Sequence, residues 1–222
     1  MNKDVLIESG LLDGISGKNI TIVLTAANPT RRAYERGDVV REEGCVLDSF
    51  GVLEEGSLLF QRYHMDGHTQ IAHVATAPAI VGTEVVASRT RITPTHIVAG
   101  DSGSILWFSR KHLLENRQIP AEVALRIQRN LLRILADDYI RFMNKADILS
   151  LRTVRERALY YFEILRDRHG DEINLGMTQA EFANYLCVDR TSLTHELSLL
   201  RQEGILDHYG KQYKLLTPKK PI

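Results

Sequence analysis

The chain has 222 residues, enough for one large domain or two ordinary ones with a packed core. Apolar residues make up 44% and charged residues 25%, a balance typical of folded proteins and not of disordered chains. Lys plus Arg number 28 and Asp plus Glu number 28, which excludes a global positive field drawing the chain to nucleic acid or an anionic membrane. A local basic face is still compatible with this balance.

The N-terminal segment does not resemble a signal peptide, because Glu8, Gly10 and Asp13 interrupt it before an apolar run develops. No apolar span in the chain approaches the thickness of a membrane. Two cysteines, Cys45 and Cys187, are too few and too far apart for a disulfide-rich secreted domain. We therefore expect a cytoplasmic protein with no membrane partner.

Residues from Thr30 to about Phe108 have the pattern of many short strands, because brief apolar runs are separated by turn signals such as Arg36-Gly37-Asp38 and Gly100-Asp101-Ser102-Gly103. The clearest element is a hairpin with Met65-Asp66-Gly67 at its turn, where glycine tolerates a positive φ. This region predicts a barrel or sandwich.

After Pro120 the pattern becomes helical, with apolar residues that include Val123, Ile127, Leu131 and Phe142 and with no glycine. More than twenty residues of helix need a partner for their apolar stripe, and a second copy of the chain is the economical one. A break near Asp147 is expected. A further helix is expected after it, with Gly170 as its cap.

The C-terminal region predicts a helix, a tight turn, a second helix and a hairpin. Thr178 and Glu181 have the spacing of a capping box, and Asp189 is placed to cap the second helix. Leu193, Leu197 and Leu200 form its buried stripe. The outer face at the start of this helix is small and polar: Arg190, Thr191, Ser192, Thr194 and His195. This composition is typical of a helix that reads base edges in the DNA major groove, although a merely solvated polar face is the alternative.

The segment resembles the winged helix-turn-helix of the Crp/Fnr superfamily of bacterial transcription regulators. The resemblance extends upstream, where Tyr34-x-x-Gly37-Asp38, Phe50-Gly51-Val52, Asp66-Gly67 and Val81-Gly82-Thr83-Glu84 are similar to the cyclic-nucleotide-binding-type β-roll of that family. It implies an α+β fold in three parts. These are a β-roll of double-stranded β-helix or jelly-roll type over residues 1–118, a dimerisation helix over 119–147 and a winged helix-turn-helix domain over 148–222.

The resemblance implies a homodimer, joined through residues 119–147, that binds a pseudo-palindrome in double-stranded DNA, with RNA polymerase as a candidate partner. It places Arg190 at a base or phosphate, and Thr191 and His195 stand where the family usually has Glu and Arg. Thr178, Gln179 and Lys211 are predicted to contact phosphates. Residues 148–222 carry 11 Lys and Arg against 10 Asp and Glu, so we expect binding to depend on a few placed residues.

The resemblance also locates an effector pocket in the β-roll, closed by the long helix. Its candidate residues are Gly82, Thr83, Glu84, Thr93, Thr95, Phe142 and Met143. Where cyclic-AMP-binding members have an Arg-Ser step, this chain reads Ile92-Thr93-Pro94, so a guanidinium for the phosphate is missing. We therefore expect no response to cyclic AMP. An iron–sulfur cluster held by four Cys thiolates is not expected in a chain with two cysteines.

The sequence leaves two alternative functions open for the β-roll region. A haem-sensing or redox-sensing regulator of the same fold would use a histidine or Cys45, but each is more readily explained as an ordinary structural residue. A cupin-like metal enzyme would need His64, His68, His73 and Glu54 or Glu55 to converge. Their spacing is not that of cupin motifs, and such an enzyme has no need of a winged helix. We therefore expect a regulator that is not an enzyme, has no metal site or resident cofactor and responds to an unidentified effector.

Overall fold

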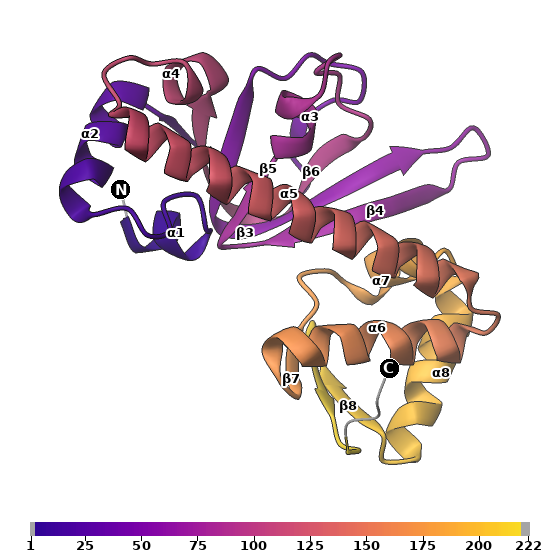
Figure 1. Ribbon diagram of the computed structural model, residues 1–222. Coiled ribbons are helices and arrows are strands. Elements are labelled where there is room, and N and C mark those ends of the chain that lie inside the picture. Colours follow the sequence, from indigo (N-terminus) through magenta and orange to yellow (C-terminus); the bar gives the residue numbers. More distant parts are fainter. Residues whose placement is uncertain (1–2, 219–222) are drawn as a thin grey trace. The chain divides into compact units, whose positions relative to one another are not determined.

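A computed structural model describes residues 3–218 (Figure 1). The chain divides into two compact units. The first contains the residues up to Arg62 together with Val74–Tyr139, and the second contains Tyr63–His73 together with the residues from Ile140 onward. No helix in the described range is long and apolar enough to cross a membrane.

The first unit is built on an antiparallel sheet, as the brief apolar runs separated by turn signals predict. Its path is β1-β6-β3-β4, with β2 paired to β6 and β5 paired to β3. The strands are β1 (Thr30–Tyr34), β2 (Val39–Arg41), β3 (Ser49–Tyr63), β4 (Thr69–Thr76), β5 (Ala79–Val81) and β6 (His96–Ser109). The short helices are α1 (Lys3–Glu8), α2 (Gly17–Ala27), α3 (Thr83–Ala87) and α4 (Arg110–Leu114). The prediction of a β-roll is confirmed, whereas α1 to α4 had no counterpart in the sequence analysis.

The core of this unit lies between the strands and helices. Phe50 on β3 and Phe108 on β6 are opposite each other in register, and their rings stack with centroids 6.1 Å apart. Both are fully buried, so each contributes a large apolar area to the hydrophobic stabilisation of the roll. The hairpin between β3 and β4 turns at Gly67, which has a φ of 85° and donates its amide to the carbonyl of His64 at 3.0 Å.

Helix α5 (Ala121–Ser150) is one unbroken helix (Figure 1). It is apolar on two faces. Val123, Ile127 and Leu131 lie on the first face and belong to the core of the β-roll. The expectation that a second copy covers the stripe was therefore wrong for these three residues, because they pack into the core of the same chain, where Asn130 of α5 also donates to the carbonyls of Leu11 and Asp13. Phe142, the last residue of the predicted stripe, is exposed. The second face, which includes Leu125 and Leu132, is exposed.

The second unit contains a small three-stranded sheet and three helices in addition to the end of α5. The helices are α6 (Val154–His169), α7 (Gln179–Leu186) and α8 (Arg190–Gln202), and the sheet has the order β7 (Glu172–Asn174), β9 (Gln212–Leu215), β8 (Leu206–Tyr209). Gly170 caps α6 with a φ of 81°, as predicted. The predicted break near Asp147 falls later, because α5 continues to Ser150 and buries Ile148.

Candidate nucleic-acid interface

Helix α7 begins at the predicted capping box. The backbone amide of Thr178 donates to the Glu181 carboxylate at 2.6 Å, and the amide of Glu181 donates to the Thr178 hydroxyl at 3.3 Å. These two bonds satisfy amides that have no partner within the helix, so the start of α7 is fixed locally. Phe182 and Leu186 are fully buried beneath it, and Ala183 is 1% exposed.

The turn between α7 and α8 contains Cys187 in the left-handed conformation, with a φ of 52°. The Cβ of a non-glycine residue costs about 1–2 kcal/mol in this conformation. The surrounding bonds hold it there, since its amide donates to the carbonyl of Ala183 and Val188 donates to the same carbonyl at 3.1 Å. A tight turn of this kind brings two helices together at a fixed angle.

Helix α8 is capped by Asp189, which accepts from the amides of Thr191 at 2.8 Å and Ser192 at 3.0 Å. The hydrogen bond from Ser192 is the main reason that the pKa of this carboxyl lies below its usual value. Leu193, Leu197 and Leu200 are at most 1% exposed, which confirms the predicted buried stripe. The opposite face of α8 is consequently turned to solvent.

That outer face contains the predicted set at the start of α8. All five residues are exposed: Arg190, Thr191, Ser192, Thr194 and His195. The hydroxyl of Thr194 donates to the carbonyl of Arg190 at 2.9 Å, so its proton is used within the helix while its methyl group and lone pairs remain available. A shallow depression of about 430 Å³ runs along this face and is also lined by Ser198. Ser198 was not predicted, although its position three residues after His195 places it on the same face.

The predicted wing is present. Strands β8 and β9 are antiparallel, and Tyr209 opposes Gln212 at the tip next to Gly210, which has a φ of 60°. Tyr209 is 90% exposed and was not singled out from the sequence. Lys211 lies beside it and is partly exposed. An exposed aromatic ring next to a cation is suited to contact with sugar and phosphate.

Several cations of the second unit pair with carboxylates of the same unit. Arg155 contacts Glu203, Arg201 lies 3.0 Å from Asp207, and Lys214 lies 3.1 Å from Glu172. Arg190 forms no ion pair with any residue in the described part of the chain, and its position at the first turn of α8 leaves its guanidinium free for an external partner. The domain as a whole is therefore nearly neutral, yet it carries the positive charge of Arg190 on the outer face of α8.

The two residues predicted to contact phosphate at the start of α7, Thr178 and Gln179, differ in their surroundings. The hydroxyl oxygen of Thr178 accepts from the Glu181 amide in the capping box, which leaves its proton available to donate to an anion at the start of α7. Gln179 is the first residue of α7 and is partly exposed.

The residues predicted for an effector pocket fall in both units. Gly82 precedes α3 with a φ of 81°, Thr83 is buried and Glu84 is exposed. Thr93 donates its hydroxyl to the carbonyl of Glu42 at 2.6 Å, so this hydroxyl is committed to the loop before Cys45. The other three are Thr95, which is buried in the first unit, and Phe142 and Met143, which are exposed on the part of α5 in the second unit.

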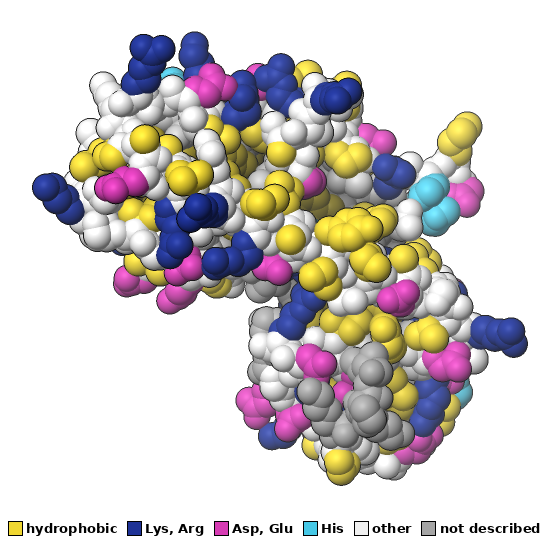
Figure 2. All heavy atoms as spheres, viewed as in Figure 1, with side chains coloured by type: hydrophobic (Ala, Val, Ile, Leu, Met, Phe, Trp, Pro, Cys, Tyr) yellow, Lys and Arg dark blue, Asp and Glu magenta, His cyan; other side chains and the backbone are white. Residues whose placement is uncertain are grey.

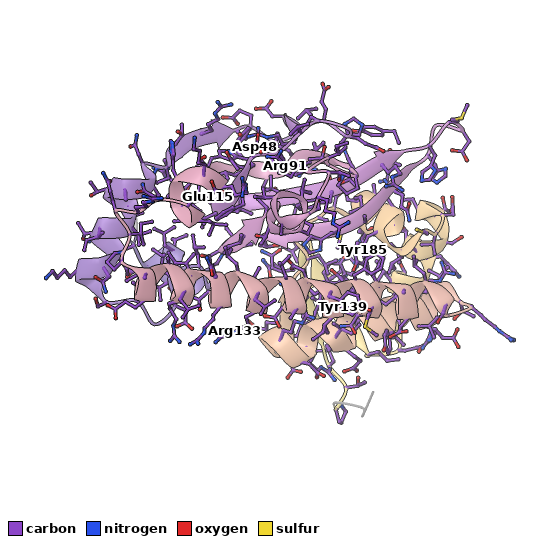
Figure 3. The ribbon with its side chains drawn as sticks, turned by 45° about the horizontal axis from the view of Figure 1, so that its top comes forward. Asp48, Arg91, Glu115, Arg133, Tyr139 and Tyr185 are labelled. Atoms are coloured by element: carbon purple, nitrogen blue, oxygen red, sulfur yellow. The ribbon has the colours of Figure 1, made fainter. Side chains whose placement is uncertain are left out.

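The arginine just upstream of Thr93 is occupied. Arg91 pairs with Asp48, and Figure 3 shows these two side chains beside each other. The histidines of the hairpin are also engaged: His64 and His68 stack with ring centroids 4.1 Å apart, and His68 contacts Asp66. Among residues 3–218, no three His, Cys, Asp or Glu side chains are grouped as the ligands of a metal ion would be.

Comparison with known proteins agrees with this geometry. Residues 151–220 match the model of the Crp-like helix-turn-helix domain. FixK2 from Bradyrhizobium japonicum has a TM-score of 0.72 at 18% identity, over 85% of this chain and 93% of that one. The c-di-GMP-responsive regulator CLP from Xanthomonas campestris has a TM-score of 0.71 at 17% identity, over 91% and 100%. A CooA mutant from Carboxydothermus hydrogenoformans has a TM-score of 0.64 at 13% identity, over 98% and 92%.

No curated protein sequence matches the chain. The solved structures are less than 25% identical to it and establish the fold, while the domain match identifies the C-terminal region directly. Residues 151–220 therefore belong to the Crp-like helix-turn-helix domain family, and the chain as a whole has the fold of the Crp-type regulators to which it is similar.

Proposed function

We propose that the protein regulates transcription as a homodimer that reads a pseudo-palindromic DNA site through two copies of α8. The observation that carries this proposal is the outer face of α8, where small polar side chains surround Arg190, which forms no ion pair with any of residues 3–218. Arginine is suited to a bidentate contact with guanine, and the helix start is the part that meets base edges. RNA polymerase is the further partner that a DNA-bound regulator of this kind would affect.

The second face of α5 supports the homodimer. Leu125, Leu132 and Tyr139 recur every seven residues and are 47%, 67% and 64% exposed. Phe142 and Met143 continue the same side of the helix, and Figure 2 shows hydrophobic side chains gathered along it. A seven-residue repeat on a helix is the pattern by which two helices pack as a coiled coil. A second copy of α5 therefore matches this face in both chemistry and period.

Selection from a pool of random DNA duplexes tests the proposal. We expect the full chain to enrich a pseudo-palindrome whose half-site centres are about 34 Å apart, because two symmetry-related helices enter successive major grooves on one side of the duplex. The retained duplexes are sequenced, and binding is then measured by fluorescence anisotropy. Enrichment of a single asymmetric half-site, or no enrichment over the starting pool, would contradict a dimeric sequence-specific reader.

The effector of the β-roll is proposed to be a ligand other than cyclic AMP, and no resident metal or iron–sulfur cluster is proposed. Support comes from the loop where a phosphate-binding arginine would be needed. Thr93 is committed to the carbonyl of Glu42, and Arg91 is committed to Asp48. A buried phosphate without a guanidinium loses a strong charge-assisted contact. No catalytic chemistry is assigned to the protein.

Native mass spectrometry of the full chain mixed with cyclic AMP tests the choice of effector. We expect no adduct of the nucleotide at concentrations up to about a millimolar, since affinity that weak amounts to only about −4 kcal/mol. A stoichiometric adduct on each protomer would overturn the exclusion of cyclic AMP while leaving the DNA-binding proposal intact.

A further inference from the structure

The hydroxyl group of Thr194 is bonded to the backbone of its own helix. It donates to the carbonyl of Arg190, one turn earlier in α8, at 2.9 Å. A hydroxyl has a single proton, so this bond removes Thr194 as a donor to DNA. The bond also fixes the side chain, because holding one branch of Cβ against the preceding turn sets the direction of the other branch. Thr194 is exposed, so its methyl group is the part presented on the outer face of α8.

The other hydroxyl groups of this face are committed in the same way. The hydroxyl of Ser198 donates to the carbonyl of Thr194 at 2.9 Å. The Asp189 carboxylate, whose pKa is lowered chiefly by the Ser192 amide, also receives hydrogen bonds from the side chains of Thr191 and Ser192. The serine and threonine side chains of the face therefore offer lone pairs and, on the two threonines, a methyl group, but no proton.

The methyl group of Thr194 has a counterpart in the major groove. Thymine carries a C5-methyl group there, and apolar contact with a threonine methyl is one of the ways in which proteins recognise it. Cytosine and the purines have no methyl group at this edge. The shallow depression of about 430 Å³ on the outer face of α8 is lined in part by Arg190, Thr194 and Ser198. A thymine methyl projects from the base edge and can enter such a depression.

The position of Thr194 limits which base it can reach. Residues four apart on a helix have Cβ atoms about 5–6 Å apart, so Thr194 lies beside Arg190 on the same face. Successive bases of one strand are separated by about 3.4 Å along the DNA axis. The base that Thr194 contacts therefore lies within about two base pairs of the guanine assigned to Arg190.

We propose that Thr194 is a specificity-determining residue that reads the C5-methyl group of a thymine close to the guanine contacted by Arg190. The proposal rests on the proposed DNA-binding function and deepens it, because it assigns a second base of the half-site and the chemical group by which that base is chosen. All the contacts that carry it lie within α8 and its cap.

Uracil substitution in the selected duplex tests the proposal, since deoxyuridine lacks only the C5-methyl group and keeps every hydrogen-bonding group of thymine. Each thymine of the half-site is replaced in turn, with the same change in both half-sites, and binding of the full chain is measured by fluorescence anisotropy. We expect a loss of about fourfold per half-site, roughly fifteenfold for the pair, as for one buried methyl group. The sensitive thymine should lie within about two base pairs of the position at which Arg190→Ala loses base preference.

Two substitutions separate the methyl group of Thr194 from its hydroxyl. Thr194→Ser removes the methyl group and should bind the thymine and uracil duplexes equally. Thr194→Val has methyl groups on both branches and no hydroxyl, so it should retain the preference for thymine. Thr25→Ser is the matched control, because Thr25 is exposed on α2 and its hydroxyl likewise donates to the carbonyl of Thr21, one turn earlier, at 2.9 Å. This control should behave as the wild type does.

The outcomes separate the inference from the function on which it rests. A selected half-site with no thymine near that guanine, or a wild type that binds every uracil duplex as tightly as the thymine duplex, overturns the inference alone and requires no variant. A preference for thymine that persists in Thr194→Ser also overturns it. Loss of the preference in Thr194→Val, with retention in Thr194→Ser, would show that the hydroxyl accepts from a base instead. If the wild type selects no duplex at all, the proposed function fails and the inference fails with it.

Discussion

Leu132→Asp should convert the protein into monomers and weaken its binding to the selected duplex by about a hundredfold or more. The affinity falls because, in a dimer, binding of the first recognition helix raises the effective concentration of the second at its half-site. Leu132 is 67% exposed and stands at the centre of the seven-residue repeat with Leu125 and Tyr139. Figure 3 shows Tyr139 on the same helix. A carboxylate at this position would be buried without a partner in a coiled coil, which strongly disfavours association.

Sedimentation velocity gives the oligomeric state and fluorescence anisotropy gives the affinity. Circular dichroism should show no loss of helix, because the substituted side chain does not belong to the core of the chain. Asp137→Lys is the matched control, since it also changes the charge of α5 at an exposed position but lies off the repeat. A Leu132→Asp protein that remains dimeric would show that the exposed face of α5 is not the dimer interface.

Arg190→Ala is expected to relax base preference at one position of each half-site, at a cost of about 1–3 kcal/mol against the preferred base. The guanidinium is the one large donor in the predicted set at the start of α8. Because the side chain is exposed and Asp189 still caps the helix, the fold of the domain should not change. Affinities for duplexes carrying each of the four bases at that position measure the effect.

Lys211→Ala is the companion to Arg190→Ala, because a wing lysine that meets phosphate carries no base information. We expect it to weaken binding to all duplexes equally and to reduce the slope of log affinity against log salt by about one unit. Equal losses of base preference from both substitutions would contradict the division between α8 and the wing.

Local patterns in the sequence correctly predicted the helix-turn-helix. A capping box, an Asp cap and leucines at helical spacing involve residues that are neighbours along the chain, and the structure places Thr178, Asp189 and Leu197 as predicted. The outer face of α8 follows from the same periodicity, because the buried stripe leaves Arg190 and His195 on the other side. Ser198 and Tyr209 were missed although helical spacing and the wing tip offered a signal for each.

The partner of α5 was not predictable in the same way. The sequence shows that Val123, Ile127 and Leu131 form a stripe that needs cover, but periodicity does not say which surface covers it. Only the tertiary structure assigns this stripe to the β-roll of the same chain and leaves Leu132 and Tyr139 for a second copy.

The sequence by itself determined the helices and caps of the helix-turn-helix and the chemistry of the outer face of α8, because these depend on residues within a few positions of one another. Tertiary structure alone decided where Lys145 lies. It stands 74 residues from Ile71 and 40 from Tyr185 in sequence, yet it contacts both carbonyls. Such contacts arise when distant segments pack, and no local pattern encodes them.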